Sequence, residues 1–411
     1  MLKKHILFIS SYEIVYNPRL IKAADYLFNK GWEITVLTPV IGLVNKTTYN
    51  DFIKSRKWNI IEIDISKRSL KSKVKWAYAS IYQRIHQFIF EKFNIETKGM
   101  QLLNKSLYAY SINQIPTVDV VYINLIDNLK FATQLKKNRN CSLLVFDSQE
   151  YFTGQYSVDK SFKNKWVNKI EKQYIKEADI ICSTTNAMKD VIEHRYAIKD
   201  VIKLRNLPFT KSLQYSSVLD NSKPLKLIWH GLSINYNSRG VNIIITALSL
   251  VNQPIHLTLQ GNINSTQKEI IRNEIERLNI RNKISIIEPA HPDCIVESLL
   301  KYDVGVIGEL PLEDNQRLTS SNKLFEYIQA GLCVVTSNMP GIVETIDEYH
   351  VGEVYDAGNA NELAEKLAFL CKNQELLNNY KAASQKAAEE LIWQTDFDHV
   401  YIQLNTLLNN V

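Results

Sequence analysis

Short apolar runs alternate along this chain with longer amphipathic segments. The runs His5–Ile9, Val118–Ile123 and Leu225–Trp229 predict strands that are buried on both faces. Between such runs lie segments with apolar residues at helical spacing, such as Pro18–Lys30, which starts with proline in the first turn and stops before Gly31. This alternation predicts an α/β fold with parallel, doubly wound sheets. Further expected strands are Ile34–Leu37, Ile60–Ile65, Ser142–Phe146, Asp179–Ser183, Val201–Leu204, Ile255–Gln260 and Tyr302–Gly308.

The stretch Ser320–Ile346 packs several predicted elements into a short span. A helix begins where Ser320 or Ser321 can cap the first amides with its hydroxyl, and it ends at Gly331. A buried strand, a turn and the start of another helix follow. Lys323 and Glu326 lie three residues apart, on neighbouring positions of the first turn. They form either an ordinary surface ion pair or a nucleotide site, in which the helix terminus and Lys323 bind phosphate and Glu326 binds ribose hydroxyls.

Length and composition are those of a globular protein with two cores. At 411 residues, with 45% apolar and 22% charged residues, the chain predicts two domains of about 200 residues each. Its five cysteines form no CxxC pair, so we expect no zinc or redox motif, no metal site and buried thiols in a reducing compartment. The first apolar run is too short for a signal peptide, and no run is long enough to span a membrane. We therefore expect a cytoplasmic protein.

Charge is concentrated near the N-terminus. Residues 1–100 hold 17 Lys and Arg against 8 Asp and Glu, a net charge of +9, whereas the whole chain carries +6. The basic, aromatic-rich stretch Ser66–Asn94 has apolar residues at near-helical spacing. Two interpretations stay open: an anionic membrane surface contacts this stretch, at the inner face of the cell membrane, or it is a helix packed on the sheet with a solvated basic face. No nucleic-acid motif accompanies the charge, so we expect no nucleic-acid partner.

The run Asn322-Lys323-Leu324-Phe325-Glu326-Tyr327, followed by Ala330-Gly331 and Pro340-Gly341, resembles the donor-nucleotide segment of glycosyltransferase family 4. One branch of that family carries such a run. The resemblance implies a retaining enzyme with the B-type fold, in which two Rossmann-like domains face each other across a cleft. It also implies that a nucleotide-sugar is the donor substrate, that no cofactor or metal is needed, and that the acceptor is a glycan or a lipid-linked molecule.

The resemblance also assigns roles to residues of this chain. On the donor side it implies catalytic roles for Arg239, Lys323 and Glu326, and donor contacts by Gly231, Ser320, Ser321, Asn322 and Leu324. Ser238-Arg239-Gly240 is expected to open a helix. Two features depart from the family. The family places two basic residues against the donor diphosphate; Arg239 matches the second, but the first is absent because Leu232 and Ser233 are neutral. In addition, Leu318 stands where many members have a glutamate.

On the acceptor side the resemblance implies roles for Arg19, Gln149 and Glu150. Gln149 stands where the family often has a histidine, and an amide cannot carry a proton at neutral pH, so no acid–base role is assigned to it. Arg19 either meets an acceptor phosphate or is a solvated charge at a helix start, and the second interpretation is favoured.

The expected organisation is an acceptor-binding domain over residues 1–208, a donor-binding domain over 209–390, and a helix over 391–411 that crosses back to the first domain. Residues 211–224 read as the linker. The predicted function is sugar transfer in bacterial cell-surface polysaccharide synthesis. Two alternatives remain: a nucleotide-sugar epimerase, which shares the fold, and a non-catalytic partner subunit, which the departures at Leu318 and Gln149 favour.

Overall fold

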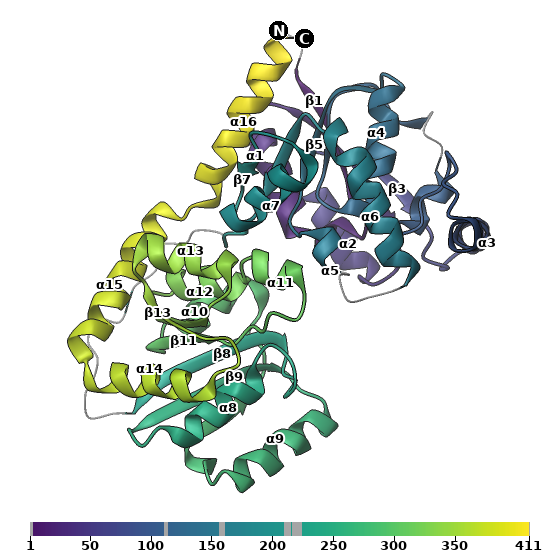
Figure 1. Cartoon of the computed structure of the whole chain (residues 1–411). Coiled ribbons are helices and arrows are strands. Elements are labelled where there is room, and N and C mark those ends of the chain that lie inside the picture. Colours follow the sequence, from purple (N-terminus) through teal and green to yellow (C-terminus); the bar gives the residue numbers. More distant parts are fainter. Residues whose placement is uncertain (1–2, 111–113, 156–160, 209–214, 216–223, 411) are drawn as a thin grey trace. The chain divides into compact units, whose positions relative to one another are not determined.

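The computed structural model describes residues 3–110, 114–155, 161–208, 215 and 224–410 (Figure 1). Contacts divide the chain into two compact units. Unit 1 consists of the chain up to Thr184, Lys189–Leu204 and the chain from Asp396 onward, and unit 2 of Thr185–Met188 and Arg205–Thr395. Each unit contains one parallel sheet with helices, which confirms the predicted fold class. The cleft and the domain boundaries stay predictions. The linker 211–224 lies outside the described residues except for Tyr215 and Pro224.

Seven parallel strands form the sheet of unit 1, in the order β3-β2-β1-β4-β5-β6-β7. In β1, Ile6 lies opposite Ile34 on one side and Val120 on the other, and Ile6 to Ile9 are fully buried. The chain therefore adds strands to one side of β1 and then to the other, with the reversal between β1 and β4. The strands are β1 His5–Ile9, β2 Glu33–Val40, β3 Asn59–Asp64, β4 Val118–Ile123, β5 Cys141–Asp147, β6 Ile180–Ser183 and β7 Ile202–Lys203.

The helices of unit 1 largely follow the apolar periodicity. They are α1 Pro18–Asn29, α2 Lys46–Lys54, α3 Leu70–Phe93, α4 Leu129–Lys137, α5 Phe152–Gln155, α6 Phe162–Tyr174 and α7 Asn186–Tyr196, whose first residues belong to unit 2. Asn17 caps α1, since its side chain accepts a hydrogen bond from the Leu20 amide at 3.3 Å. The helix predicted to run to Glu177 ends as an α-helix at Tyr174, and a 3₁₀ turn covers the remaining residues.

Six parallel strands form the sheet of unit 2, in the order β10-β9-β8-β11-β12-β13. Here the strand order reverses between β8 and β11, which pair directly through Leu227 and Val304. The core that packs on this sheet is apolar and excludes solvent, with Trp229 and Tyr355 each 1% exposed. The strands are β8 Leu225–Ser233, β9 Ile255–Asn262, β10 Ile284–Ile287, β11 Val304–Ile307, β12 Cys333–Ser337 and β13 Gly352–Tyr355.

The helices of unit 2 are α8 Val241–Leu250, α9 Ser265–Arg277, α10 Ile295–Leu299, α11 Asp314–Leu318, α12 Asn322–Gln329, α13 Pro340–Tyr349, α14 Ala360–Lys372 and α15 Gln374–Glu390. One prediction is corrected. The helix expected to open at Ser238 begins at Val241, because Arg239 and Gly240 both have left-handed backbone conformations, with φ of 51° and 69°. Gly331, which was expected to end α12, has a φ of 68°.

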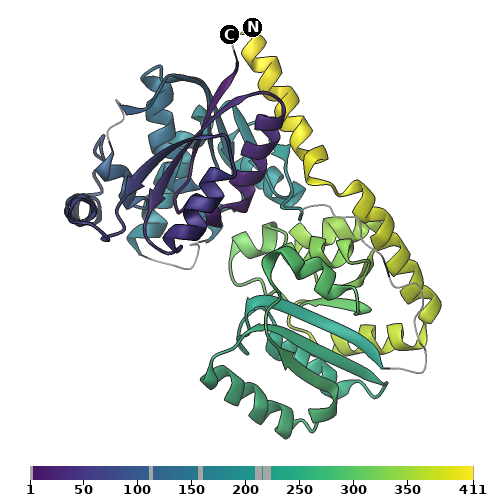
Figure 2. The ribbon, with the colours of Figure 1, turned by 180° about the vertical axis from the view of Figure 1, so that it is seen from behind.

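The long helix α3 leaves most of its apolar side chains exposed. Only Ser72, Ala79 and Phe90 of this 24-residue helix are buried. In both views α3 lies at the margin of unit 1, seen nearly along its axis (Figures 1 and 2). The interpretation of Ser66–Asn94 as a helix with its apolar face packed on the sheet is therefore wrong. Its exposed apolar residues are Leu70, Val74, Tyr78, Ile81, Tyr82, Ile85, Phe88 and Phe93.

The last helix, α16 Trp393–Asn409, belongs to unit 1 from Asp396 onward. Phe397 is fully buried, and its ring lies 5.0 Å from Tyr26 in α1 and 6.3 Å from Tyr122 in β4, measured between ring centroids. The Tyr26 hydroxyl also donates a hydrogen bond to Asp398. Among the described helices, none is both long enough and apolar enough to span a bilayer.

Candidate donor and acceptor sites

The two strand reversals place one candidate site on each sheet. In open parallel sheets, ligands bind beyond the carboxyl ends of the strands where the strand order reverses. In unit 2 this edge carries His230 and Gly231, near the end of β8, and Gly308 and Glu309, which follow β11. The pairing of β8 with β9 shifts register between His230 and Ser233, an irregularity that often re-aims side chains beside a site.

Glycines let the loop before α8 contact the end of β11. A Cβ atom at Gly240 would lie 1.8 Å from the carbonyl oxygen of Gly308, so no other residue fits there. This contact fixes the position of Arg239, whose own φ is 51°. The Arg239 side chain is exposed and forms no hydrogen bond or ion pair within the described part of the chain. The structure therefore leaves its guanidinium available but does not bring it against Lys323 or Glu326.

Helix α12 presents an uncapped N-terminus at this edge. Ser321 occupies the N-cap position, but its side chain makes no capping hydrogen bond, which corrects the predicted cap. The Ser320 hydroxyl is buried and has no hydrogen-bond partner. Asn322 accepts a hydrogen bond from Asn206 at 2.9 Å. With no capping side chain, first-turn amides of α12 remain for an anion, as phosphate sites at helix termini require.

Lys323 is buried in an ion pair that the sequence did not reveal. Its Nζ lies 2.8 Å from Oε1 of Glu309, and the two side chains are only 4% and 14% exposed. The same ammonium lies 3.4 Å from the Ser321 hydroxyl and 5.5 Å from the centroid of the Trp229 ring. The surface pair of Lys323 with Glu326 that helical spacing suggested does not form. Instead, Lys323 joins the start of α12 to the end of β11.

Glu326 lies beside His230, at the end of β8. Oε2 of Glu326 is 3.1 Å from Nε2 of His230, and the glutamate side chain is 15% exposed. That ring nitrogen makes no hydrogen bond, so the contact satisfies neither group completely. Partial exposure leaves the carboxylate able to accept hydrogen bonds from a ligand.

The next residue, Tyr327, fixes α12 on the sheet. Its hydroxyl donates to the carbonyl of Ile228 at 3.2 Å, and its ring fills the space over Gly305, where a Cβ would lie 2.3 Å from the ring. Leu324 is fully buried, so the side chain of this predicted donor contact belongs to the core, and its amide donates to the carbonyl of Ser321 at 3.0 Å. Gly231 lies at the edge, and a Cβ there would meet the Trp229 ring at 2.9 Å.

Arg19 in unit 1 is part of a buried ion pair, so the favoured interpretation as a solvated charge is wrong. Its guanidinium donates to both carboxylate oxygens of Asp147, at 2.7 and 2.6 Å, and to the carbonyl of Leu204 at 2.7 Å. The side chains of Arg19 and Asp147 are 2% and 0% exposed. Tyr122 donates to the same carboxylate at 2.8 Å. Arg19 therefore holds the end of β5, immediately before Gln149 and Glu150.

Gln149 and Glu150 line a cavity of about 540 Å³ at the carboxyl edge of the unit 1 sheet. Asp127, which follows β4, lines the same cavity. Burial raises the pKa of Asp127, against the opposing effect of a hydrogen bond from Ser11. Tyr12, which follows β1, is hydrogen bonded to Gln149, and burial raises the pKa of its hydroxyl. The structure therefore brings the two predicted acceptor-side residues together with two polar groups from the strand reversal.

Four residues of these sites were not predicted: Tyr12, Asp127, His230 and Glu309. Each follows within a few residues of a predicted strand that borders a strand reversal. With the strand order known, their location just after a strand at the reversal would have identified them as candidates. No group of three or more His, Cys, Asp or Glu residues in the described ranges is arranged to hold a metal ion.

Comparison with known proteins identifies the second unit. The family model of glycosyl transferases group 1 matches residues 233–387, which include α8, α12 and the end of β11. Residues 233–387 therefore form a glycosyltransferase domain. No curated protein matches its sequence. The match confirms the glycosyltransferase resemblance for this domain, whereas the role of the Asn322–Tyr327 run stays a prediction.

Solved structures share the fold of this glycosyltransferase over nearly its whole length. A glycosyltransferase from Rickettsia africae aligns with a TM-score of 0.66 and 14% identity, covering 100% of both chains. HepE of Anabaena, solved with UDP, aligns with a TM-score of 0.65 and 13% identity, over 98% of this chain and 100% of HepE. A TarM variant from S. aureus, solved with UDP and glycan ligands, aligns with a TM-score of 0.66 and 10% identity, over 98% and 100%. At such identities the likeness supports the fold alone.

Proposed function

We propose that this glycosyltransferase moves a sugar from a nucleotide-sugar to a glycan or lipid-linked acceptor, with retention at the anomeric carbon. The observation that carries the proposal is the placement of Lys323 and Glu326 on α12, inside the matched domain and at the strand reversal of unit 2. Glu326 accepts hydrogen bonds from two ribose hydroxyls, and Lys323 leaves Glu309 for the donor diphosphate.

Negative charge builds up on the leaving diphosphate during this reaction, and the enzyme has to stabilise that charge. Preorganised cations and amides that face developing charge lower the barrier more than groups that must reorganise. In the proposal Lys323 and the amides at the start of α12 meet the diphosphate, and Arg239 supplies the second positive charge from the loop before α8. These groups would stabilise the leaving group without a metal ion or a cofactor. UDP is the first nucleotide to test, because the HepE and TarM structures contain it.

The acceptor binds at the unit 1 edge in this proposal. The cavity lined by Gln149, Glu150 and Asp127 offers the hydrogen-bonding groups that sugar hydroxyls need. Since Gln149 cannot act as a base, the proton of the acceptor hydroxyl is taken by the leaving phosphate on the same face of the donor sugar. Arg19 has a positioning role, through Asp147, in keeping this edge in place.

A membrane surface is the partner that α3 fits best. Its apolar stripe, with Ile81 57% and Phe88 58% exposed, is unfavourable in water. Transfer of this stripe from water into a bilayer interface would lower the free energy. Lysines and arginines flank the stripe, and anionic lipids attract such residues. The proposal therefore places the enzyme at the inner face of a bacterial membrane, where it acts in cell-surface polysaccharide synthesis.

The reaction can be tested before the acceptor is known, because glycosyltransferases of this kind would transfer sugar slowly to water. Proton NMR of the purified protein with UDP-glucose, UDP-N-acetylglucosamine and GDP-mannose follows nucleotide release and the anomer formed first. We expect turnover of one α-linked donor, the α-anomer first, and an unchanged rate in EDTA. The β-anomer first contradicts retention, and loss of turnover in EDTA contradicts metal independence. An epimerised nucleotide-sugar identifies an epimerase, and no turnover with no binding identifies a non-catalytic partner.

A further inference from the structure

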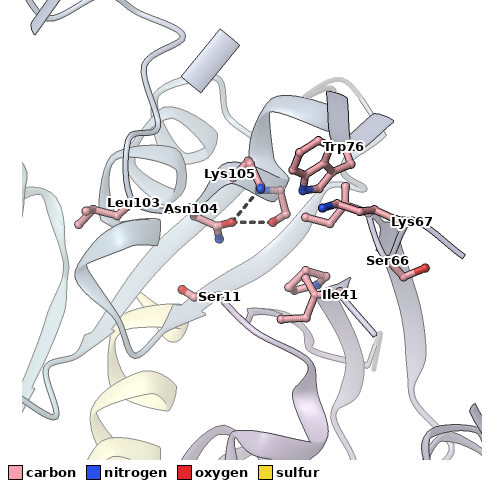
Figure 3. Close-up of a pocket in the computed structure, with 11 residues that line it drawn as sticks. Ser11, Ile41, Ser66, Lys67, Trp76, Leu103, Asn104 and Lys105 are labelled. Carbon is pink, nitrogen blue, oxygen red and sulfur yellow. Dashed lines mark hydrogen bonds between the residues drawn. The ribbon is translucent and has the colours of Figure 1, made fainter. Parts of the chain in front are cut away.

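A second cavity in unit 1, of about 440 Å³, has features of an anion site (Figure 3). It opens at the carboxyl ends of β1, β2 and β3, where a parallel sheet binds its ligands. None of the eleven residues that line it, all in the described part of the chain, is acidic. Two are lysines: Lys67, from the loop between β3 and α3, and Lys105, from the segment after α3.

Trp76 brings these two lysines together. Nζ of Lys67 lies 3.5 Å and Nζ of Lys105 lies 4.7 Å from the centroid of the Trp76 ring, and Figure 3 shows the three side chains converging at one end of the cavity. The attraction of each ammonium to the ring partly offsets their mutual repulsion. Burial lowers the pKa of Lys105, and the positive charges of Lys67 and Arg84 lower it further. Lys67 is exposed and Lys105 is half-buried, and no carboxylate lines the cavity, so an anion bound between the two ammonium groups would relieve their repulsion.

Local backbone conformation and hydrogen bonds hold the segments that carry the two lysines. Lys67 has a φ of 64°, a left-handed conformation that non-glycine residues adopt mainly where the surroundings impose it. Asn104, before Lys105, is 4% exposed and bonded to Asn128 at 2.8 Å and to the Ser106 amide at 3.1 Å. Lys105 is thus anchored by its neighbours rather than placed on a free loop.

The anion site adjoins the acceptor cavity and begins the exposed face of α3. Leu103 lines both cavities, and Ser11, which lines this one, is hydrogen bonded to the acceptor-side Asp127. Trp76 lies in α3, whose exposed apolar residues continue with Tyr78, Ile81, Tyr82, Ile85, Phe88 and Phe93. A ligand with a sugar in one cavity, an anion in the next and an apolar chain along α3 would use all three features.

We propose that the Lys67–Trp76–Lys105 cluster binds a phosphate or diphosphate group of the acceptor, which makes the acceptor a phosphate-bearing, lipid-linked molecule. This inference rests on the proposed function and names its acceptor class. The same phosphate chemistry could come from the headgroups of membrane lipids, and the experiment separates the two sources.

Anion binding at this site can be measured by reductive methylation of lysines, with the methylation rate of each lysine followed by mass spectrometry. Inorganic pyrophosphate is the probe, and Lys71 and Lys73, exposed on the first turn of α3, are internal controls in the same wild-type chain. At saturating pyrophosphate we expect methylation of Lys67 and Lys105 to slow roughly tenfold, since a bound anion protects in proportion to occupancy. The rates of Lys71 and Lys73 should stay unchanged. Equal rates at all four lysines, with and without pyrophosphate, overturn the proposal.

Vesicles distinguish acceptor phosphate from lipid headgroups. If Lys67 and Lys105 are protected only on phosphatidylglycerol vesicles, together with Lys71 and Lys73, the cluster belongs to a membrane face and the proposal fails. The double variant Lys67→Gln/Lys105→Gln, with Lys71→Gln/Lys73→Gln as its charge-matched control, should lose pyrophosphate binding at this site and keep nucleotide binding in unit 2. Calorimetry with nucleotides therefore tests the proposed function separately, because a wild-type protein that binds no nucleotide can still show protected lysines.

Discussion

Replacing Lys323 by methionine separates its structural role from its proposed role toward the donor. Methionine keeps the length and apolar stem of lysine but removes the ammonium, which leaves the carboxylate of Glu309 without its partner at 2.8 Å. Breaking a buried ion pair from one side costs about 3–5 kcal/mol. Glu309 keeps 14% of its surface exposed, so we expect the lower end, about 3 kcal/mol. For a unit of this size that corresponds to a fall in melting temperature of roughly 6–12 °C.

Glu309→Gln completes the comparison. Alone it leaves the Lys323 ammonium buried beside a neutral amide, and a fall in melting temperature of similar size is expected. The double variant Lys323→Met/Glu309→Gln removes both charges, so its stability should return to within about 1 kcal/mol of wild type. Differential scanning fluorimetry of the four proteins measures this cycle.

Nucleotide binding should respond in a different pattern. Both variants with Lys323→Met lose the charged donor to the diphosphate, so affinity should fall about tenfold or more, even where stability is restored. Glu309→Gln alone should bind nucleotide at least as tightly as wild type, because Lys323 no longer has to leave a carboxylate. If the double variant regains both stability and nucleotide affinity, Lys323 is structural and not a phosphate ligand.

Three further perturbations test other parts of the structure. Gly305→Ala places a Cβ 2.3 Å from the ring of Tyr327, so unit 2 should lose about 1–3 kcal/mol, as measured by urea unfolding; an unchanged midpoint contradicts the tight packing of α12. Burial raises the pKa of Asp127, so stability linked to this carboxyl is fully present below its ordinary pKa and is lost as pH rises through the folded pKa. Asp127→Asn should therefore raise the melting temperature at pH 7 and leave it nearly unchanged at pH 3, and an equal gain at both would refute the assignment. Ile81→Gln/Ile85→Gln should weaken binding to phosphatidylglycerol vesicles in flotation assays without lowering the melting temperature, because both side chains are at least half exposed, at 57% and 50%; a lower melting temperature would mean that this face is packed.

Local patterns in the sequence were sufficient to predict much of both sheets. Apolar runs such as His5–Ile9 coincide with strands, because a strand buried on both faces needs apolar residues at every position. Helix α12 was found with nearly its observed bounds, since Gly331 ends it by adopting a positive φ. The fold class follows from the alternation of these elements, and the structure confirms it.

The pairing of charges could not be predicted from local patterns. Lys323 pairs with Glu309, 14 residues earlier, and Arg19 pairs with Asp147, 128 residues later, and only strand order brings these partners together. Periodicity predicted a helix in Ser66–Asn94 but not which of its faces is covered, because a membrane-facing helix and a core helix share one pattern. The hydroxyl cap predicted at Ser321 does not form either, since its side chain lies near Lys323 instead.

The central claim is that a nucleotide binds unit 2 through the carboxylate of Glu326, and calorimetry tests it most directly. Wild type, Glu326→Gln and the control Glu365→Gln, an exposed glutamate of α14, are titrated with UDP, GDP and their sugars. We predict that one nucleotide binds wild type and the control equally, and that Glu326→Gln binds it about 10- to 100-fold more weakly, since hydrogen bonds to a charged acceptor are lost. Undiminished binding by Glu326→Gln, or no binding of any nucleotide by the folded wild type, would contradict the claim.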